Sequence, residues 1–301
     1  MVKTFHDIIS KTKNQDIKIV AVAAAEDTHV LEAISDAKKQ GICNAILVGD
    51  EEKIGKIAED INFDLKDIEI INEKNPSKAS MKAVALVSEG KADMVMKGLV
   101  GTADFLRAVL NKEIGLRTGS LMSHVAVFET PKIDRLLFLT DCAFNMYPDL
   151  NEKVQIINNA VKVAIAVGIE IPKVAPICAV EVVNPKMQAT VDAAMLSKMN
   201  ERGQIKNCII DGPLAIDNAL SVEAAETKGI NSEVAGYADI LLMPSIEAGN
   251  VMYKTLAFTT DSVSGGILVG TSAPVILTSR ADSHRTKMNS IALAALVATN
   301  K

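Results

Sequence analysis

The stretch that decides the fold class of this 301-residue chain is Lys18-Ile-Val-Ala-Val-Ala-Ala-Ala25. A continuous apolar run of this kind is typical of a strand that is covered on both faces, as strands are in parallel sheets. Asp27-Thr28 then begins a helix pattern, which ends at Gly41, and Ala45–Gly49 follows as the next apolar run. Strands and helices that alternate at this spacing predict an α/β fold with a parallel sheet.

The same alternation continues to the C-terminus, and no low-complexity segment or Gly/Ser linker interrupts it. Further strands are predicted at 68–71, 92–96, 123–128, 135–140, 173–178, 207–211, 240–243 and 275–277. Helices are predicted at 4–13, 27–40, 51–60, 77–89, 102–110, 151–168, 185–199, 250–260 and 284–297. Any second domain would therefore be connected by a short hinge near Pro148 and by a second crossing near Gly265, where the chain returns to the first domain.

Composition and charge exclude several classes of protein. Hydrophobic residues make up 49% of the chain, and the net charge of −5, without a basic run, argues against a nucleic-acid binder. Neither a signal peptide nor a run of about 18 apolar residues is present, which argues against a membrane protein. No C-x-x-C spacing occurs, so we expect reduced, mostly buried thiols in a cytoplasmic protein at Cys43, Cys142, Cys178 and Cys208.

Several nucleotide, metal and hydrolase motifs are absent from the sequence. The chain has no G-x-x-x-x-G-K-[ST] and no G-x-G-x-x-G, which argues against a P-loop NTPase and weakens the case for a Rossmann dehydrogenase. It also lacks G-x-S-x-G, and its four histidines have no metal-ligand spacing. We therefore expect neither a metal ion nor a resident cofactor.

A candidate anion site follows the predicted strand 275–277. Ser279, Arg280 and Asp282 come between this strand and the helix from His284, with Ser283 or Asp282 as its N-cap. The start of a helix directs N–H groups and a positive dipole end at one point, and Arg280 adds a fork of donors that matches phosphate. The alternative interpretation is a plain turn with a solvated Arg280.

Other strand ends carry small or cationic residues. Lys97-Gly98 follows one strand and leads to a helix that carries Arg107, although Lys97 could equally be a solvated loop residue. Thr140-Asp141 and the segment 244–250 follow two other strands. Because ligands of open α/β sheets bind at the carboxyl ends of the strands, these loops predict a phosphorylated or pyrophosphate-bearing substrate.

Short blocks in these loops resemble the phosphate acetyl/butyryltransferase family, in order and over essentially the full chain. They are Lys97-Gly98 with Thr102–Arg107, Thr140–Ala143, Ser232–Gly236, Gly249–Lys254 and Thr278–Arg280. Details of Met96–Val100, Arg117–Phe128 and Gly270–Ser283 are most similar to the butyryl branch of the family.

The resemblance implies a two-domain, three-layer α/β fold like that of the isocitrate and isopropylmalate dehydrogenases. Its mostly parallel sheets would flank an interdomain cleft, with residues 1–147 plus 266–301 in the first domain and 148–265 in the second. The implied reaction is butanoyl-CoA + phosphate ⇌ butanoyl phosphate + CoA, by direct attack in a ternary complex without an acyl-enzyme. The implied partners are acyl-CoA, phosphate and further copies of the chain, in a homodimer or a larger homo-oligomer.

The resemblance also assigns roles to residues. Ser279 matches a serine that bonds the developing negative oxygen, Arg280 an arginine that holds the phosphoryl group, and Arg107 an arginine at the phosphate end of CoA. The family's catalytic aspartate would fall at Thr286, so Asp282 is either the base or a helix cap. The predicted substrate-binding set is Lys97, Gly98, Thr102, Arg107, Ser123, Thr140, Asp141, Asn250, Tyr253 and Lys254.

Two alternatives to a butanoyl transferase stay open at this point. Acyl-chain preference depends on the shape of a site, so a phosphate acetyltransferase is the nearer alternative. From another class, the implied architecture also suits an NAD-dependent 2-hydroxyacid oxidoreductase, although no aspartate cluster for its usual metal is evident.

Overall fold

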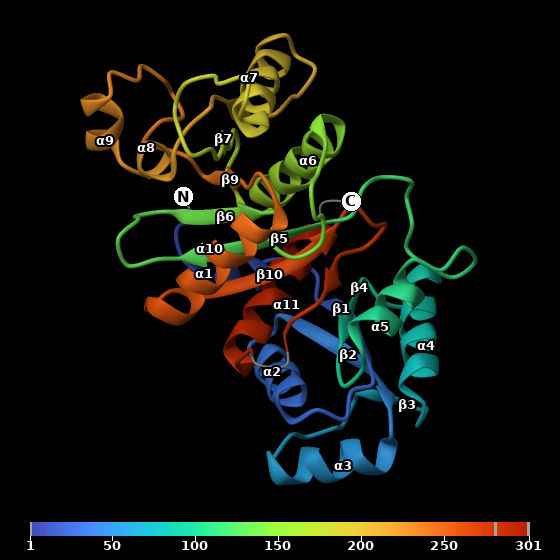
Figure 1. Cartoon of the computed structure of the whole chain (residues 1–301). Helices are drawn as coiled ribbons and strands as arrows, with labels where there is room; N and C mark the ends of the chain where they lie inside the picture. Colours follow the sequence, from blue (N-terminus) through green and yellow to red (C-terminus); the bar gives the residue numbers. More distant parts are fainter. Residues whose placement is uncertain (1, 280–281, 300–301) are drawn as a thin grey trace. The chain divides into compact units, whose positions relative to one another are not determined.

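A computed structural model describes residues 2–279 and 282–299. The described residues form a mixed α/β protein that groups into two compact units (Figure 1). The terminal unit comprises Phe5–Ser120 and the chain from Gly265 on, and the middle unit comprises Leu121–Ser264 with the residues before Phe5. Residues 121–147 group with the middle unit, whereas the sequence placed them in the first domain. The domain borders stay a prediction.

The sheet of the terminal unit has the strand order β3-β2-β1-β4-β11-β10. Neighbouring strands pair in parallel, except β10 and β11, which are antiparallel. β1 lies between β2 and β4, and it is fully buried from Val20 on, as its apolar run predicted. The bounds are β1 Lys18–Ala23, β2 Cys43–Gly49, β3 Glu69–Asn72, β4 Met94–Lys97, β10 Val263–Val269 and β11 Val275–Ile276.

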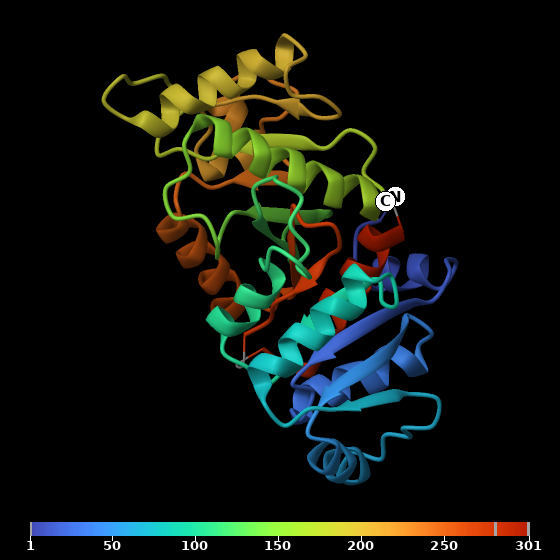
Figure 2. The same cartoon turned by 90° about the vertical axis from the view of Figure 1, so that its right-hand side faces the viewer.

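Helices cover both faces of this sheet. α11 packs against α1 and α2, and α4 packs against α5 and β1 (Figure 2). Asp27, Asp50 and Asn75 each accept a backbone N–H bond at the start of α2, α3 and α4, so three helices begin where the sequence offers a cap. The bounds are α1 Phe5–Thr12, α2 Thr28–Lys39, α3 Glu51–Asp60, α4 Pro76–Ser88, α5 Thr102–Val109 and α11 His284–Thr299.

The middle unit has the strand order β5-β6-β9-β7-β8, with β5 and β6 antiparallel and the other pairs parallel. Alternate residues, such as Ala126 and Phe128 of β5, join one buried apolar cluster together with side chains of α10. α6 packs against β5, β6, β9 and α7. The bounds are β5 Ser123–Glu129, β6 Leu136–Thr140, β7 Lys173–Pro176, β8 Ile209–Ile210, β9 Ile240–Leu242, α6 Leu150–Val167, α7 Gln188–Glu201, α8 Ile216–Leu220, α9 Val222–Thr227 and α10 Ile246–Thr259.

The predicted α/β class is confirmed, and the differences lie where local signals are weak. α8 and α9 are too short to show a clear period, and neither was predicted. β10 was missed because Gly265-Gly266 interrupts its apolar pattern, yet Gly265 lies so close to α11 that an added Cβ would be 3.0 Å from Asn289. The dehydrogenase-like arrangement with an interdomain cleft stays a prediction. In the described ranges, every helix is too short or too polar to cross a bilayer.

The middle unit buries an ion pair between α6 and α7. Nζ of Lys153 lies 2.5 Å from Oδ2 of Asp192, and each side chain is 7% exposed. Gln188 donates a second hydrogen bond, of 2.8 Å, to the other carboxylate oxygen of Asp192. The pair lines a cavity of about 570 Å³ together with Tyr147 and Met195. A buried pair of this kind is costly to break because the surviving charge keeps its desolvation penalty.

We expect Lys153→Met to lower the free energy of unfolding by about 3–5 kcal/mol, because Asp192 would be left buried without its partner. The double variant Lys153→Met/Asp192→Leu should recover most of that loss. Urea unfolding measures both, with Lys198→Met as the control, since its pair with Glu201 is exposed and solvent screens it. If Lys153→Met lowers the free energy of unfolding no more than Lys198→Met does, the interpretation of a costly buried pair is contradicted.

Candidate functional site

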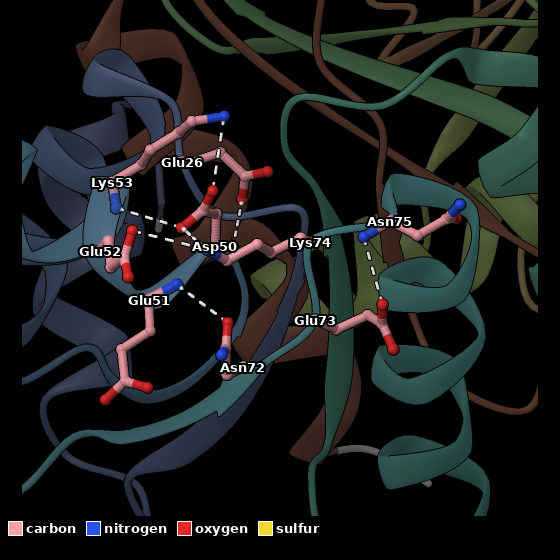
Figure 3. A network of polar contacts seen from close by, with 9 residues as sticks. All are labelled: Glu26, Asp50, Glu51, Glu52, Lys53, Asn72, Glu73, Lys74 and Asn75. Carbon is pink, nitrogen blue, oxygen red and sulfur yellow. Dashed lines mark hydrogen bonds and ion pairs between the residues drawn. The ribbon is translucent and has the colours of Figure 1, made fainter.

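The carboxyl ends of β1, β2 and β3 form a polar edge of the terminal unit (Figure 3). Asp50 caps α3, its backbone N–H donates to Glu26 at 3.3 Å, and Lys53 and Lys74 lie 3.5 and 4.0 Å from its carboxylate. Asn72 accepts from the backbone N–H of Glu51, and Glu73 accepts from that of Asn75. These groups satisfy one another and begin helices, and the predicted site residues are not among them.

Lys97 ends the neighbouring strand β4 and is 5% exposed. Its ammonium donates to the carbonyl oxygens of Gly98 at 3.1 Å and Val100 at 3.2 Å. The interpretation of Lys97 as a solvated loop residue is therefore wrong, because the loop folds back over its side chain. An added Cβ on Gly98 would lie 2.2 Å from the carbonyl oxygen of Ala24, so this glycine lets the loop pack against the end of β1.

The loop leads into α5, which carries two further residues of the predicted site. Gly101 is the N-cap and has no side chain, so it offers no side-chain acceptor to the N–H groups of the first turn. Thr102 is the exposed first residue of the helix. Arg107, in the last turn, has a side chain that is 74% exposed and pairs with Asp104 at 2.5 Å. Both residues are accessible, and their roles in binding stay predictions.

The turn between β11 and α11 carries the predicted catalytic residues, of which Arg280 lies outside the described residues. Ser279 is exposed, and its backbone N–H donates to the carboxylate of Asp282 at 2.7 Å. Ser283 accepts from the backbone N–H of Thr286 at 3.2 Å and is therefore the N-cap of α11. The interpretation of Asp282 as the helix cap is wrong, because its carboxylate closes the turn on Ser279 instead.

Sequence reasoning missed Lys287, the residue beneath this turn. Its side chain lies in the first turn of α11, and the residue is 3% exposed. Its ammonium donates to the carbonyl oxygens of Ser279 at 3.0 Å and Asp282 at 2.7 Å. Burial lowers the pKa of Lys287 below its ordinary value, while the charges of Asp282 and Asp27 oppose that shift. The available signal was a lysine directly before the long buried run of α11.

In the middle unit, Asp141 follows β6 and is 3% exposed. Its carboxylate accepts the backbone N–H groups of His124, Ala143, Phe144 and Asn145 at 2.9–3.2 Å and the side-chain amide of Asn145 at 2.7 Å. An added Cβ on Gly249 of α10 would lie 2.4 Å from the Asp141 carbonyl oxygen. Asp141 therefore holds the loop after β6 in place, and α10 packs directly on that loop.

The other predicted residues of the middle unit fall into two groups. Ser123 and Thr140 are fully buried, and their hydroxyls bond to Asn159 and to the carbonyl of His124, each at 2.9 Å. Along α10, Asn250 donates to the carbonyl of Cys142 at 3.2 Å, the Tyr253 ring packs edge-on to Phe128, and Lys254 is exposed. The structure thus brings Asn250 against the loop after β6, which Asp141 holds, and places the Tyr253 ring on β5 near both His124 and Phe128.

All four cysteines are free and buried, as the sequence predicted. Burial raises the pKa of the Cys142 thiol well above its ordinary value, and the charge of Asp141 adds to that shift. Burial likewise raises the pKa of Cys43 to about 12. Because the thiolate is the nucleophilic form, these residues are poorly suited to nucleophilic catalysis.

Known proteins similar to the chain were found by sequence and by structure. The family model of the phosphate acetyl/butaryl transferases matches residues 4–80 and 73–295. A phosphate butyryltransferase of Clostridium acetobutylicum is 71% identical over 301 residues, which is 100% of both chains. A crystal structure of a branched-chain phosphotransacylase from Enterococcus faecalis is 30% identical with a TM-score of 0.81, covering 94% of this chain and 99% of that one.

A more distant structural neighbour is similar in fold alone. The 4-hydroxythreonine-4-phosphate dehydrogenase from Burkholderia phymatum is 12% identical with a TM-score of 0.57, covering 94% of this chain and 99% of that one. The family match covers almost the whole sequence, and the high identity extends from one end to the other. The chain belongs to the phosphate acetyl/butaryl transferase family.

Proposed function

We propose that the chain transfers a butanoyl group between coenzyme A and inorganic phosphate, by direct attack of phosphate on the thioester in a ternary complex. The observation that carries this proposal is the 71% identity, over the full length of both chains, to a protein named phosphate butyryltransferase. Ser279, Arg280 and Arg107, all of the terminal unit, are proposed to take the roles that the family resemblance implies.

Direct attack requires the enzyme to hold two anionic reactants together and to stabilise an oxyanion. Binding both reactants at one site supplies effective concentration, and cationic groups offset the repulsion between them. The uncapped start of α5 and the guanidinium of Arg280 are suited to phosphate groups. The exposed Ser279 can donate its hydroxyl hydrogen to the oxygen that gains charge, and one such donor is worth about 3 kcal/mol.

The reaction needs no acyl-enzyme in this proposal. The four cysteines are buried, and the pKa values of Cys43 and Cys142 are raised, which disfavours a thiolate nucleophile at either position. The leaving group is the CoA thiolate, and an ordinary thiol of that kind has a pKa of about 8.5. Its departure therefore requires little help from a strong acid.

Asp282 is proposed to orient Ser279 rather than to act as the base. Its carboxylate already accepts the backbone N–H of Ser279 at 2.7 Å, which fixes the turn on which the serine hydroxyl is carried. The position of the family's catalytic aspartate is occupied by Thr286, whose backbone N–H bonds the cap residue Ser283. Thr286 has no carboxylate, and one carboxylate oxygen of Asp282 is already bonded within the turn.

The remaining parts of the proposal rest on the family resemblance. We propose acyl-CoA and phosphate as substrates, no metal or redox cofactor, and a cytoplasmic homodimer or larger homo-oligomer. A preference for acetyl-CoA is the alternative within the family, since the family model covers both acyl groups. The family match and the 71% identity favour a transferase over the NAD-dependent 2-hydroxyacid oxidoreductase considered from the sequence.

We expect phosphate-dependent release of free CoA thiol from acyl-CoA, with kcat/KM highest for butanoyl-CoA, lower for propionyl-CoA and lowest for acetyl-CoA. A thiol reagent follows the release, and omission of phosphate is the control. A reversed order of preference would support the phosphate acetyltransferase. Absence of thiol release, with NAD reduction by a 2-hydroxy acid, would support the oxidoreductase and overturn the proposal.

Arg280→Ala should lower kcat/KM by a factor of about 100 or more, because a charge-assisted contact to phosphate is lost at the reacting centre. The matched control is Arg285→Ala, which removes an exposed guanidinium from the first turn of α11. The activities of both variants are measured in the thiol-release assay, under conditions in which the two proteins are equally stable. Equal activity of the two variants would remove Arg280 from the mechanism.

The variant Asp282→Asn shows whether Asp282 positions Ser279 or acts as the general base. The asparagine keeps an oxygen that can accept the Ser279 N–H but cannot take a proton from a thiol. We therefore expect kcat to fall by less than about tenfold in either direction of the reaction. A fall of about a hundredfold or more, confined to the direction that consumes free CoA, would instead identify Asp282 as the base.

A further inference from the structure

The terminal unit buries a lysine that has carbonyl oxygens, and not a carboxylate, as its partners. Lys287 is 3% exposed, and its ammonium donates to the carbonyls of Ser279 and Asp282. The buried Lys153 of the middle unit, by contrast, is paired with the carboxylate of Asp192 at 2.5 Å. Within the part of the chain that the structure describes, Lys287 belongs to no ion pair.

The stability of the helix does not account for this charge. Lys287 lies in the first turn of α11, where the positive end of the helix dipole disfavours a cation. Burial of an ammonium also carries a desolvation cost, which two carbonyl dipoles offset in part. The nearest opposing charges, Asp282 and Asp27, stabilise the ammonium at longer range. A cation kept at such a position therefore indicates a role outside the stability of the helix.

The partners of Lys287 connect it to the candidate site. Ser279 and Asp282 stand on either side of Arg280 in the sequence, and both of their carbonyls are turned to the same ammonium. The Asp282 carboxylate closes the same turn through the Ser279 N–H. The orientation of two peptide groups next to the proposed phosphate ligand thus depends on one buried side chain.

We propose that Lys287 is a positioning residue for the phosphate half of the reaction. Its ammonium holds the carbonyls of Ser279 and Asp282, and its charge favours an anion at the turn above it. This inference rests on the proposed function, because it assigns phosphate to that turn. It does not make Lys287 a catalytic residue, since the side chain acts through Ser279 and Asp282.

The decisive variant is Lys287→Met, which keeps the length of the side chain and removes both its charge and its donors. We expect the KM for phosphate to rise about tenfold or more, as for the loss of charge-assisted hydrogen bonds, and the KM for butanoyl-CoA to change less than about twofold. Lys287→Arg, which keeps the charge and the donors, should restore part of the phosphate affinity. Steady-state thiol-release kinetics with each substrate varied in turn measure this split.

The matched control is Ser290→Ala on the same helix. Ser290 is fully buried, and its hydroxyl accepts the backbone N–H of Gly266 and donates to the carbonyl of Thr286, each at 2.9 Å. Neither bond involves Ser279 or Asp282. This variant should lower the thermal midpoint of unfolding while leaving both KM values unchanged. If Lys287→Met and Ser290→Ala lose stability but share wild-type KM values, Lys287 is structural only and the inference is overturned.

A second readout uses the wild-type protein and needs no variant. Because burial lowers the pKa of Lys287, the ammonium should lose its proton below the ordinary lysine value of 10.5, although the charges of Asp282 and Asp27 oppose that shift. The KM for phosphate should therefore rise on the alkaline side in the direction that consumes butanoyl-CoA, and Lys287→Met should lack this rise. A flat alkaline profile in the wild type would count against the inference. Absence of any phosphate-dependent thiol release would instead overturn the proposed function itself.

Discussion

A charged side chain that is buried at the end of a strand has to find its partners within the protein, and this constraint shapes both units. Asp141 follows β6 and accepts the backbone N–H groups of three residues in the loop after it, as well as that of His124 in β5. Lys97 ends β4, and its ammonium donates hydrogen bonds to two carbonyl oxygens of the loop that follows. In each case the charge is satisfied by backbone dipoles, so the loop takes one conformation in order to satisfy it.

The same principle orders the turn before α11, with a different set of partners. The Asp282 carboxylate accepts the N–H of Ser279, while Lys287 donates to the carbonyls of Ser279 and Asp282. The turn is thus held by an anion and a cation at once, on different backbone groups. A site that must stabilise charge during a reaction benefits from donors that are already fixed, because little reorganisation is then required.

Close backbone packing places these loops as firmly as the charges do. An added Cβ on Gly98 would collide with the end of β1, and one on Gly249 would collide with the backbone of Asp141. Glycines at the ends of strands can permit close approach of a ligand to the backbone. Here their neighbours are other parts of the chain, so their first role is to let strand ends and loops meet.

The sequence by itself determined most of the secondary structure, including the apolar strands β1, β2 and β6 and the helices that begin at Asp50 and Ser283. These features depend on periodicity and caps, which are local. The residues of the candidate site were predicted from the family resemblance, and their roles stay predictions. Only the tertiary structure decided that Lys97 is buried, that Asp282 closes a turn instead of capping α11, and that Lys287 lies beneath Ser279. It also decided that β5–β6 and β10–β11 pair antiparallel. Strand pairing depends on how separate strands meet, and the burial and partners of Lys97, Asp282 and Lys287 depend on how a loop or turn folds back on itself. Residue type and spacing specify neither.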